Sequence, residues 1–177
     1  GTRSLPPGEE QEPRPQSEVV AVYSPKGGVG CTTLAINTAT AMTQIDKSLS
    51  VAVIDCKVQF GDVKIALDMR VDRSILDLAD NIDELDLDLI ESAMVRDDRS
   101  GLRALLAPPK PEQADLVEAS HVQMIVERLK TMFDYVIVDM GSAIRELELT
   151  IFDHADRIML VATPDLPAIT NTRNFFE

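Results

Sequence analysis

The sequence is poor in cysteine, in aromatic residues and in positive charge, and it has no long hydrophobic run. Its two cysteines, Cys31 and Cys56, are too few for a disulfide framework, which is typical of a protein in a reducing compartment. No apolar stretch approaches the roughly 20 residues that a membrane-spanning helix needs. We therefore expect a cytoplasmic protein.

Lysine and arginine together number 17 against 30 aspartates and glutamates, so the formal net charge is −13. Proteins that bind nucleic acid use clustered Lys and Arg side chains to displace counterions from phosphates, and no such cluster occurs in this sequence. We therefore expect no binding to nucleic acid. The acidic run DNIDELDLDLIE (80–91) is either a solvated surface or a docking surface for a basic partner.

The first 17 residues, GTRSLPPGEEQEPRPQS, differ in composition from the rest of the chain. They are rich in Pro, Glu and Gln, and so few apolar side chains cannot offset the entropy that is lost on ordering. We expect residues 1–17 to be a disordered linker that either follows an upstream domain or is simply a loose terminus. Residues 18–177 are expected to form one domain that is C-terminally truncated, because its last residues begin a helix that stops at Glu177.

From Val19 onward, short apolar runs alternate with longer amphipathic ones. The short runs are apolar throughout, as strands covered on both faces are. Strands that alternate with helices predict an α/β fold with a mostly parallel sheet and helices on both faces. The expected strands are 19–24, 50–55, 102–107, 135–140 and 157–163, and the expected helices are 31–42, 74–81, 86–95, 120–133 and 145–155.

The segment VYSPKGGVGCTTLA (22–35) carries the main functional signal. It follows an expected strand, contains a glycine-rich turn and leads into an expected helix. Glycines allow the backbone to wind closely around an anion, and the amides of the loop and of the helix N-terminus then point at phosphate oxygens. The sequence therefore predicts a phosphate-binding loop formed by Lys26, Gly27, Gly28, Val29, Gly30, Cys31, Thr32 and Thr33.

The string KGGVGxTT resembles the phosphate loop of the MinD/ParA family of deviant Walker ATPases, which has an extra lysine ahead of the glycines. VAVIDCKVQFGD (51–62) and FDYVIVDMGSA (133–143) are similar to the second and third motifs of that family. Within the family, QFGDVKIALDM (59–69), GLRALLAPPKPEQAD (101–115) and ATPDLPAITNTRN (162–174) resemble the CpaE/TadZ branch of proteins, which help to assemble and position Flp-type (tad) pili. The resemblance implies a P-loop NTPase-like fold.

The same resemblance implies ligands and partners. ATP or ADP would bind at the loop, where Thr33 would hydrogen-bond a phosphate, and Lys26 would reach the nucleotide of the partner in a homodimer. Mg²⁺ would be held by Thr32 and, through water, by Asp55 and Asp139. The further partners implied are pilus-assembly or polar-localisation proteins. Membrane association stays open, because a membrane-binding helix would lie beyond the last residue of this sequence.

Cys31 departs from the family pattern, since it stands where the phosphate loop has a lysine. That ammonium group offsets the charge of the phosphoryl group in transfer, and losing one such electrostatic donor costs about 100- to 1000-fold in rate. A helix N-terminus is expected to lower the pKa of a cysteine, and a thiolate would repel phosphate. The thiol of Cys31 is therefore expected to stay neutral when nucleotide is bound, and binding is expected to be weakened rather than abolished.

Lys57 is the second departure, because it occupies the second acidic position of the Asp-x-Asp motif. A protonated lysine cannot act as the base that orients an attacking water. Asp55 and Lys57 lie two residues apart, so their side chains are expected on the same face of the strand. Lys57 either replaces the positive charge lost at Cys31 or is a solvated side chain. Cys56, on the opposite face, is expected to be a buried structural thiol.

Two functions follow from these motifs. In the first, the chain is a degenerate nucleotide-binding domain with weak or no ATP hydrolysis that acts as a localisation or scaffold factor in Flp pilus assembly. In the second, it is a slow ATP-hydrolysing dimerisation switch of the MinD/ParA type. The pair Cys31 and Lys57 favours the first function. No catalytic residue is assigned beyond Lys26 acting across a dimer and Lys57 as a replacement charge.

Overall fold

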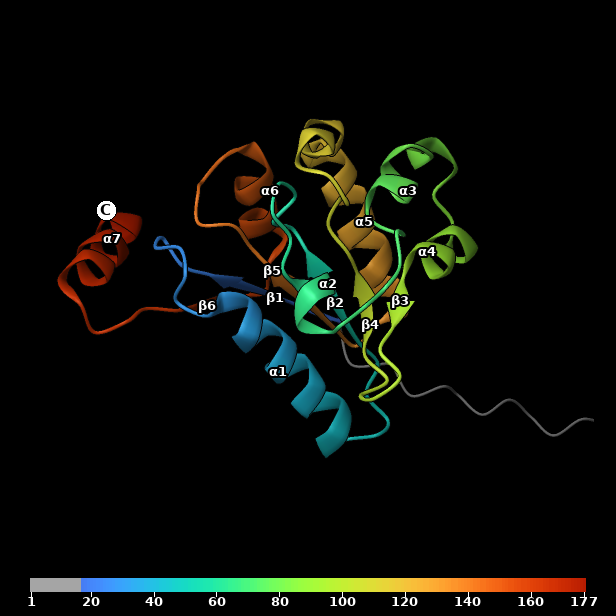
Figure 1. Cartoon of the computed structure of the whole chain (residues 1–177), viewed down its shortest axis with the longest axis horizontal. Helices are drawn as coiled ribbons and strands as arrows, with labels where there is room; N and C mark the ends of the chain where they lie inside the picture. The colour runs from blue at the N-terminus through green and yellow to red at the C-terminus, as the bar shows by residue number, and fades with distance from the viewer. Residues whose placement is uncertain (1–16) are drawn as a thin grey trace, which may run out of the picture.

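The computed structural model describes residues 17–177, so the linker expected at 1–17 lies, except for Ser17, outside the described residues. Six strands form one sheet in the order β3-β4-β2-β5-β1-β6 (Figure 1). Their bounds are Glu18–Tyr23 for β1, Val51–Asp55 for β2, Val95–Arg96 for β3, Arg103–Leu105 for β4, Tyr135–Asp139 for β5 and Arg157–Leu160 for β6.

The sheet is mostly parallel. The pairs β1–β5, β1–β6, β2–β4 and β2–β5 are parallel, and only β3 runs antiparallel to its neighbour β4. The α/β fold predicted from the sequence is thereby confirmed. Because parallel strands end at the same edge of a sheet, the last residues of β2 and β5 are neighbours, and Asp55 lies opposite Asp139 in the register.

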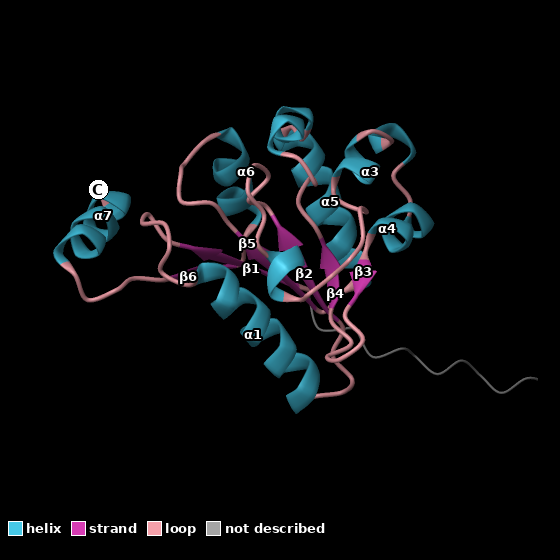
Figure 2. Cartoon of the chain, in the orientation of Figure 1, coloured by secondary structure: helices cyan, strands magenta, loops and turns pink. Residues whose placement is uncertain are grey.

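Helices cover both faces of the sheet (Figures 1 and 2). One face carries α1 and α2, the other carries α3 to α6, and α7 lies beyond the β6 edge. The bounds are Cys31–Ile45 for α1, Val63–Ala66 for α2, Leu76–Ala79 for α3, Leu87–Ala93 for α4, Ala119–Met132 for α5, Glu146–His154 for α6 and Leu166–Phe176 for α7, with short 3₁₀ turns at Ile82–Glu84 and Pro111–Leu116.

The two faces of the sheet have separate hydrophobic cores. Alternate residues of β1 point to opposite sides, so Ala21 packs with the core under α5, whereas Val20 and Val22 pack with the core under α1. Ile125 and Leu129 of α5 are fully buried in the first of these cores. Burial on both sides is the reason why the strands are apolar throughout rather than alternating in polarity.

Several expected boundaries are wrong. The helix expected at 74–81 is reduced to the single turn of α3, where the carboxylate of Asp77 accepts the N–H of Ser74 at 2.7 Å. The helix expected at 86–95 ends at Ala93, because Val95 pairs with Ala104 in the sheet. The last strand stops at Leu160 rather than at residue 163.

Candidate phosphate-binding site

The site lies at the carboxyl edge of the sheet, in the loop between β1 and α1. Gly28 and Gly30 have φ angles of 76° and 97°, in the left-handed region that glycine adopts without steric cost. Helix α1 begins directly after Gly30, and its first turn has neither a side-chain cap nor an acidic residue. No side chain therefore competes with a ligand for the free amides at the start of α1.

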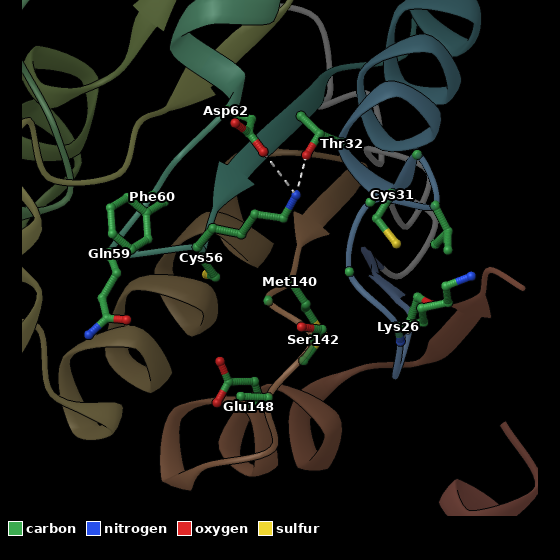
Figure 3. A pocket seen from close by; sticks show the side chains of 18 of the residues that line it. Lys26, Cys31, Thr32, Cys56, Gln59, Phe60, Asp62, Met140, Ser142 and Glu148 are labelled. Carbon is green, nitrogen blue, oxygen red and sulfur yellow. Dashed lines mark hydrogen bonds and ion pairs between the residues drawn. The ribbon is translucent and has the colours of Figure 1, made fainter. Parts of the chain in front are cut away.

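The loop opens onto a cavity of about 640 Å³, within the range of ligand pockets in proteins. All eight residues of the predicted phosphate loop, 26–33, line this cavity. Residues that follow β2 and β5 complete the wall, among them Lys57. Ser142, after β5, is labelled in Figure 3. The structure thus brings the whole predicted loop together around one space.

The side chain of Lys57 points into the site. Its ammonium group donates a hydrogen bond to Oγ1 of Thr32, and it lies 3.3 Å from Oδ2 of Asp139 and 3.4 Å from Oδ2 of Asp62. Dashed lines in Figure 3 mark its contacts with Thr32 and Asp62. The Thr32 hydroxyl in turn donates to Oδ2 of Asp139 at 2.6 Å. Of the two alternatives for Lys57, a replacement charge or a solvated side chain, the second is therefore wrong.

Of the three expected metal ligands, Thr32 lines the cavity, whereas Asp55 and Asp139 are not among its lining residues. Asp139 is fully buried; burial raises its pKa, while the hydrogen bond from Thr32 and the charge of Lys57 act in the opposite direction. Its Oδ1 atom is buried and has no hydrogen-bond partner among residues 17–177. Asp55 accepts the backbone N–H of Lys57 at 3.2 Å and that of Val63 at 3.0 Å, and burial raises its pKa to about 7.

Both cysteines are buried thiols. The expectation that the helix N-terminus would lower the pKa of Cys31 is wrong, because burial, together with the negative charge of Asp139, raises it. A neutral thiol therefore faces the cavity, as expected for the bound state. Burial raises the pKa of Cys56 well above its ordinary value, which confirms the prediction of a buried structural thiol.

Lys26 lines the cavity but takes no part in the cluster around Lys57. Its ammonium group lies 2.7 Å from Oδ2 of Asp165, just before α7. This hydrogen bond is the main cause that lowers the pKa of Asp165 to about 2. In Figure 3 the side chain of Lys26 points away from Thr32 and Asp62. The expected role of Lys26 in a partner's site stays a prediction.

Among the polar residues of the cavity wall that the sequence did not indicate, two are acidic, namely Asp62 and Glu148. Asp62 lies within the motif 51–62 and is the third oxygen partner of Lys57. Glu148 of α6 also lines the cavity, and its carboxylate accepts the N–H of Arg145 at 2.9 Å. The only available signal was the position of Asp62 shortly after an expected strand end, and the sequence held none for Glu148.

The oxygen atoms around Lys57 are of the kind that Mg²⁺ prefers, namely a hydroxyl and carboxylates. Oδ1 of Asp139, which is buried and has no hydrogen-bond partner among residues 17–177, is a further oxygen of that kind. However, the ammonium group of Lys57 already lies among the oxygens of Thr32, Asp139 and Asp62. Within residues 17–177, moreover, no group of three or more His, Cys, Asp or Glu side chains is arranged to hold a metal. The oxygens suit a cation, but a Mg²⁺ ion does not fit among them together with this lysine.

The parallel sheet, the glycine loop after β1 and the helix that follows define a P-loop NTPase-like α/β domain. The AAA domain family matches residues 17–176, and the chain belongs to this family, with relatives of the MinD/ParA type of Walker ATPase. In the part of the chain that the structure describes, none of the helices has the length and apolar character needed to cross a bilayer.

Curated relatives include two septum site-determining proteins MinD. The one from Synechocystis sp. is 29% identical over 154 residues, which are 86% of this chain and 56% of the relative. The one from Bacillus subtilis is 28% identical over 153 residues, 86% of this chain and 55% of the relative. The chain therefore spans about half the length of the curated relatives that it matches.

Solved structures show the same arrangement. A ParA family ATPase from Chlorobium tepidum TLS has a TM-score of 0.83 at 25% identity, covering 90% of this chain and 66% of that one. The MinC:MinD cell division complex of Aquifex aeolicus has a TM-score of 0.71 at 28% identity, covering 88% and 60%. MinD from Pyrococcus horikoshii, complexed with Mg-ADP, has a TM-score of 0.78 at 17% identity, covers 90% and 63%, and shows likeness of fold alone.

Proposed function

We propose that this chain is the nucleotide-binding domain of a MinD/ParA-type protein that binds ADP or ATP and hydrolyses ATP slowly or not at all. The observation that carries the proposal is the glycine loop, which lines a cavity of about 640 Å³ and leads into an uncapped helix N-terminus. The main-chain amides of such a loop hold phosphate without help from a particular side chain. The loss of the loop lysine at Cys31 therefore leaves this source of affinity in place.

The same site lacks two groups that hydrolysis needs. At the lysine position of the loop, the thiol of Cys31 is kept neutral by burial and supplies no positive charge. At the second acidic position, Lys57 is a cation bonded to Thr32 and close to Asp139, so it is not available as a base. A domain that binds nucleotide but does not turn it over is suited to a localisation or scaffold role.

For the process that the domain serves, we propose Flp (tad) pilus assembly, with pilus-assembly or polar-localisation proteins as partners and a homodimer as the working unit. Support comes from the likeness of segments 59–69, 101–115 and 162–174 to the CpaE/TadZ branch. The MinD protein of Aquifex aeolicus is found in a complex with MinC, which supports a protein partner for a domain of this kind. A slow ATP-driven dimerisation switch is the second candidate, favoured by Lys26 in the cavity wall.

Calorimetric titration with ADP and with ATP tests nucleotide binding, and two glycine variants make the test specific. Gly28 and Gly101 both have a φ of 76°, and an added Cβ would have no close contact at either. An alanine costs about 1–2 kcal/mol in this conformation, so both variants should lose similar stability. Only Gly28→Ala disturbs the loop, and we expect it to lower nucleotide affinity about tenfold while Gly101→Ala leaves affinity unchanged. Equal affinity in the two variants would place the nucleotide elsewhere.

A further inference from the structure

We infer that the ammonium group of Lys57 takes the place of the divalent cation in this site, so that the chain binds the phosphates of a nucleoside di- or triphosphate without Mg²⁺. The inference rests on the proposed function, because it concerns how the same nucleotide is held. It assigns to Lys57 a role in binding that is separate from the question of hydrolysis.

The position of the ammonium group is the first argument. It lies among oxygens of Thr32 and Asp139, two of the three side chains from which a magnesium site is predicted. A lysine ammonium has three N–H donors and no acceptor. In the structure it has three oxygen partners, and the third of them is Asp62. These oxygens hold the ammonium group in place.

The unequal exposure of these partners is the second argument. Asp139 is fully buried, whereas the side chain of Asp62 is 58% exposed and lies at the longer distance of 3.4 Å. Lys57 itself is partly accessible and lines the cavity together with the phosphate loop. A phosphate oxygen that enters the cavity can therefore replace Asp62 as the third acceptor, while Thr32 and Asp139 keep the ammonium group in place.

Charge is the third argument. A lysine cation close to a phosphate supplies a point charge of the kind that phosphate sites use. A Mg²⁺ ion at the same oxygens would be adjacent to that ammonium group and would be repelled by it. The site therefore has room for one cation, and the chain itself provides it.

The test is calorimetric titration of the chain with ADP in buffer that contains either EDTA or excess Mg²⁺. For the unmodified chain we expect dissociation constants that agree within about twofold. In EDTA, Lys57→Gln should bind ADP at least tenfold more weakly, and Mg²⁺ should restore much of the loss because the oxygens of Thr32 and Asp139 are then free. Lys64→Gln is the matched control, since Lys64 pairs with Asp72 outside the cavity, and its affinity should not change.

Each result has one meaning. If the unmodified chain binds ADP only with Mg²⁺, the inference is overturned and the proposed function stands. If it binds in neither buffer, the proposed function fails, and the inference fails with it. If Lys57→Gln binds in EDTA as well as the unmodified chain, Lys57 merely neutralises Asp139 and the inference is wrong. The comparison of the two buffers needs no variant, so a requirement for Mg²⁺ would overturn the inference even if Lys57→Gln does not fold.

Discussion

Asp55 shows how one buried carboxylate shapes the wall of the site. Its two oxygens accept the backbone N–H groups of Lys57 and Val63, which fixes the turn that leads from β2 into α2. Gly61 is packed against this turn so closely that a Cβ would lie 2.4 Å from Cβ of Ala107 and 2.6 Å from Oδ2 of Asp55. The turn that carries Lys57 and Asp62 therefore depends on the absence of a side chain at Gly61.

Gly61→Ala should lower the free energy of unfolding by about 1–3 kcal/mol, the usual cost of an overpacked site. Urea denaturation, followed by circular dichroism, measures this loss. Gly27→Ala is the control for the bare effect of a methyl group, because the nearest side-chain atom to its Cβ is Oγ of Ser142 at an ordinary 3.8 Å. If both variants lose the same stability, the close packing around Gly61 is not what limits this position.

At the same scale, the sequence indicated some features of Lys57 and left others hidden. Its spacing from Asp55 allowed the prediction that it could point toward the phosphate loop, and its ammonium group does donate a hydrogen bond to Thr32 of that loop. Its contact with Asp62 was not predictable, because it depends on how the chain turns after β2. The pKa of Cys31 was predicted in the wrong direction, since the local effect of a helix N-terminus is outweighed by burial, which only the packed fold reveals.

Among the elements, α7 has a single buried residue, Ala168. Half-buried Phe175 packs against Tyr23 and Phe152 at ring-centroid distances of 5.2 and 5.6 Å. At its first turn, Asp165 pairs with Lys26 and caps the helix by accepting the N–H of Ala168 at 3.0 Å. Phe175 thus connects α7 to β1 and α6 through aromatic contacts.

Phe175→Ala should detach α7 without unfolding the sheet. Amide hydrogen exchange in residues 166–176 should become at least tenfold faster, whereas exchange in α5, with Ile125 and Leu129 fully buried, should not change. Phe176→Ala is the matched control, because the side chain of Phe176 is 74% exposed and its loss should have little effect. Faster exchange throughout the domain would mean that α7 unfolds together with the core.

The elements that the sequence predicted well are those with long apolar patterns of their own. Helices α1 and α5 and strands β1, β2 and β5 were expected within a few residues of their observed bounds. The two-residue strand β3 and the four-residue helix α2 were missed. Elements this short lack enough periodicity to be recognised and exist only because the tertiary structure supports them.

For the molecule as a whole, the fold and the charges of the site carry different information. The mostly parallel sheet and its helices have the fold of MinD/ParA-type proteins. The charges within that fold differ from those that the sequence resemblance implies, since Cys31 stands where a loop lysine is expected and Lys57 stands where an acid is expected. A fold therefore identifies the relatives of this chain, while the charge pattern of its site determines what the chain can do.

The decisive experiment for the whole protein is phosphate release from ATP in the presence of Mg²⁺. The unmodified chain should release phosphate no faster than the buffer background. The double variant Cys31→Lys, Lys57→Asp restores the loop ammonium and the acidic group, and it vacates the cation position among Thr32, Asp139 and Asp62. Because one electrostatic donor is worth about 100-fold or more, a gain of at least that size is expected if the rest of the site is intact.

Cys31→Lys with Lys64→Asp has the same net charge but changes the second residue outside the cavity, so it should gain much less. Turnover by the unmodified chain equal to that of the double variant would instead establish the slow ATP-driven switch.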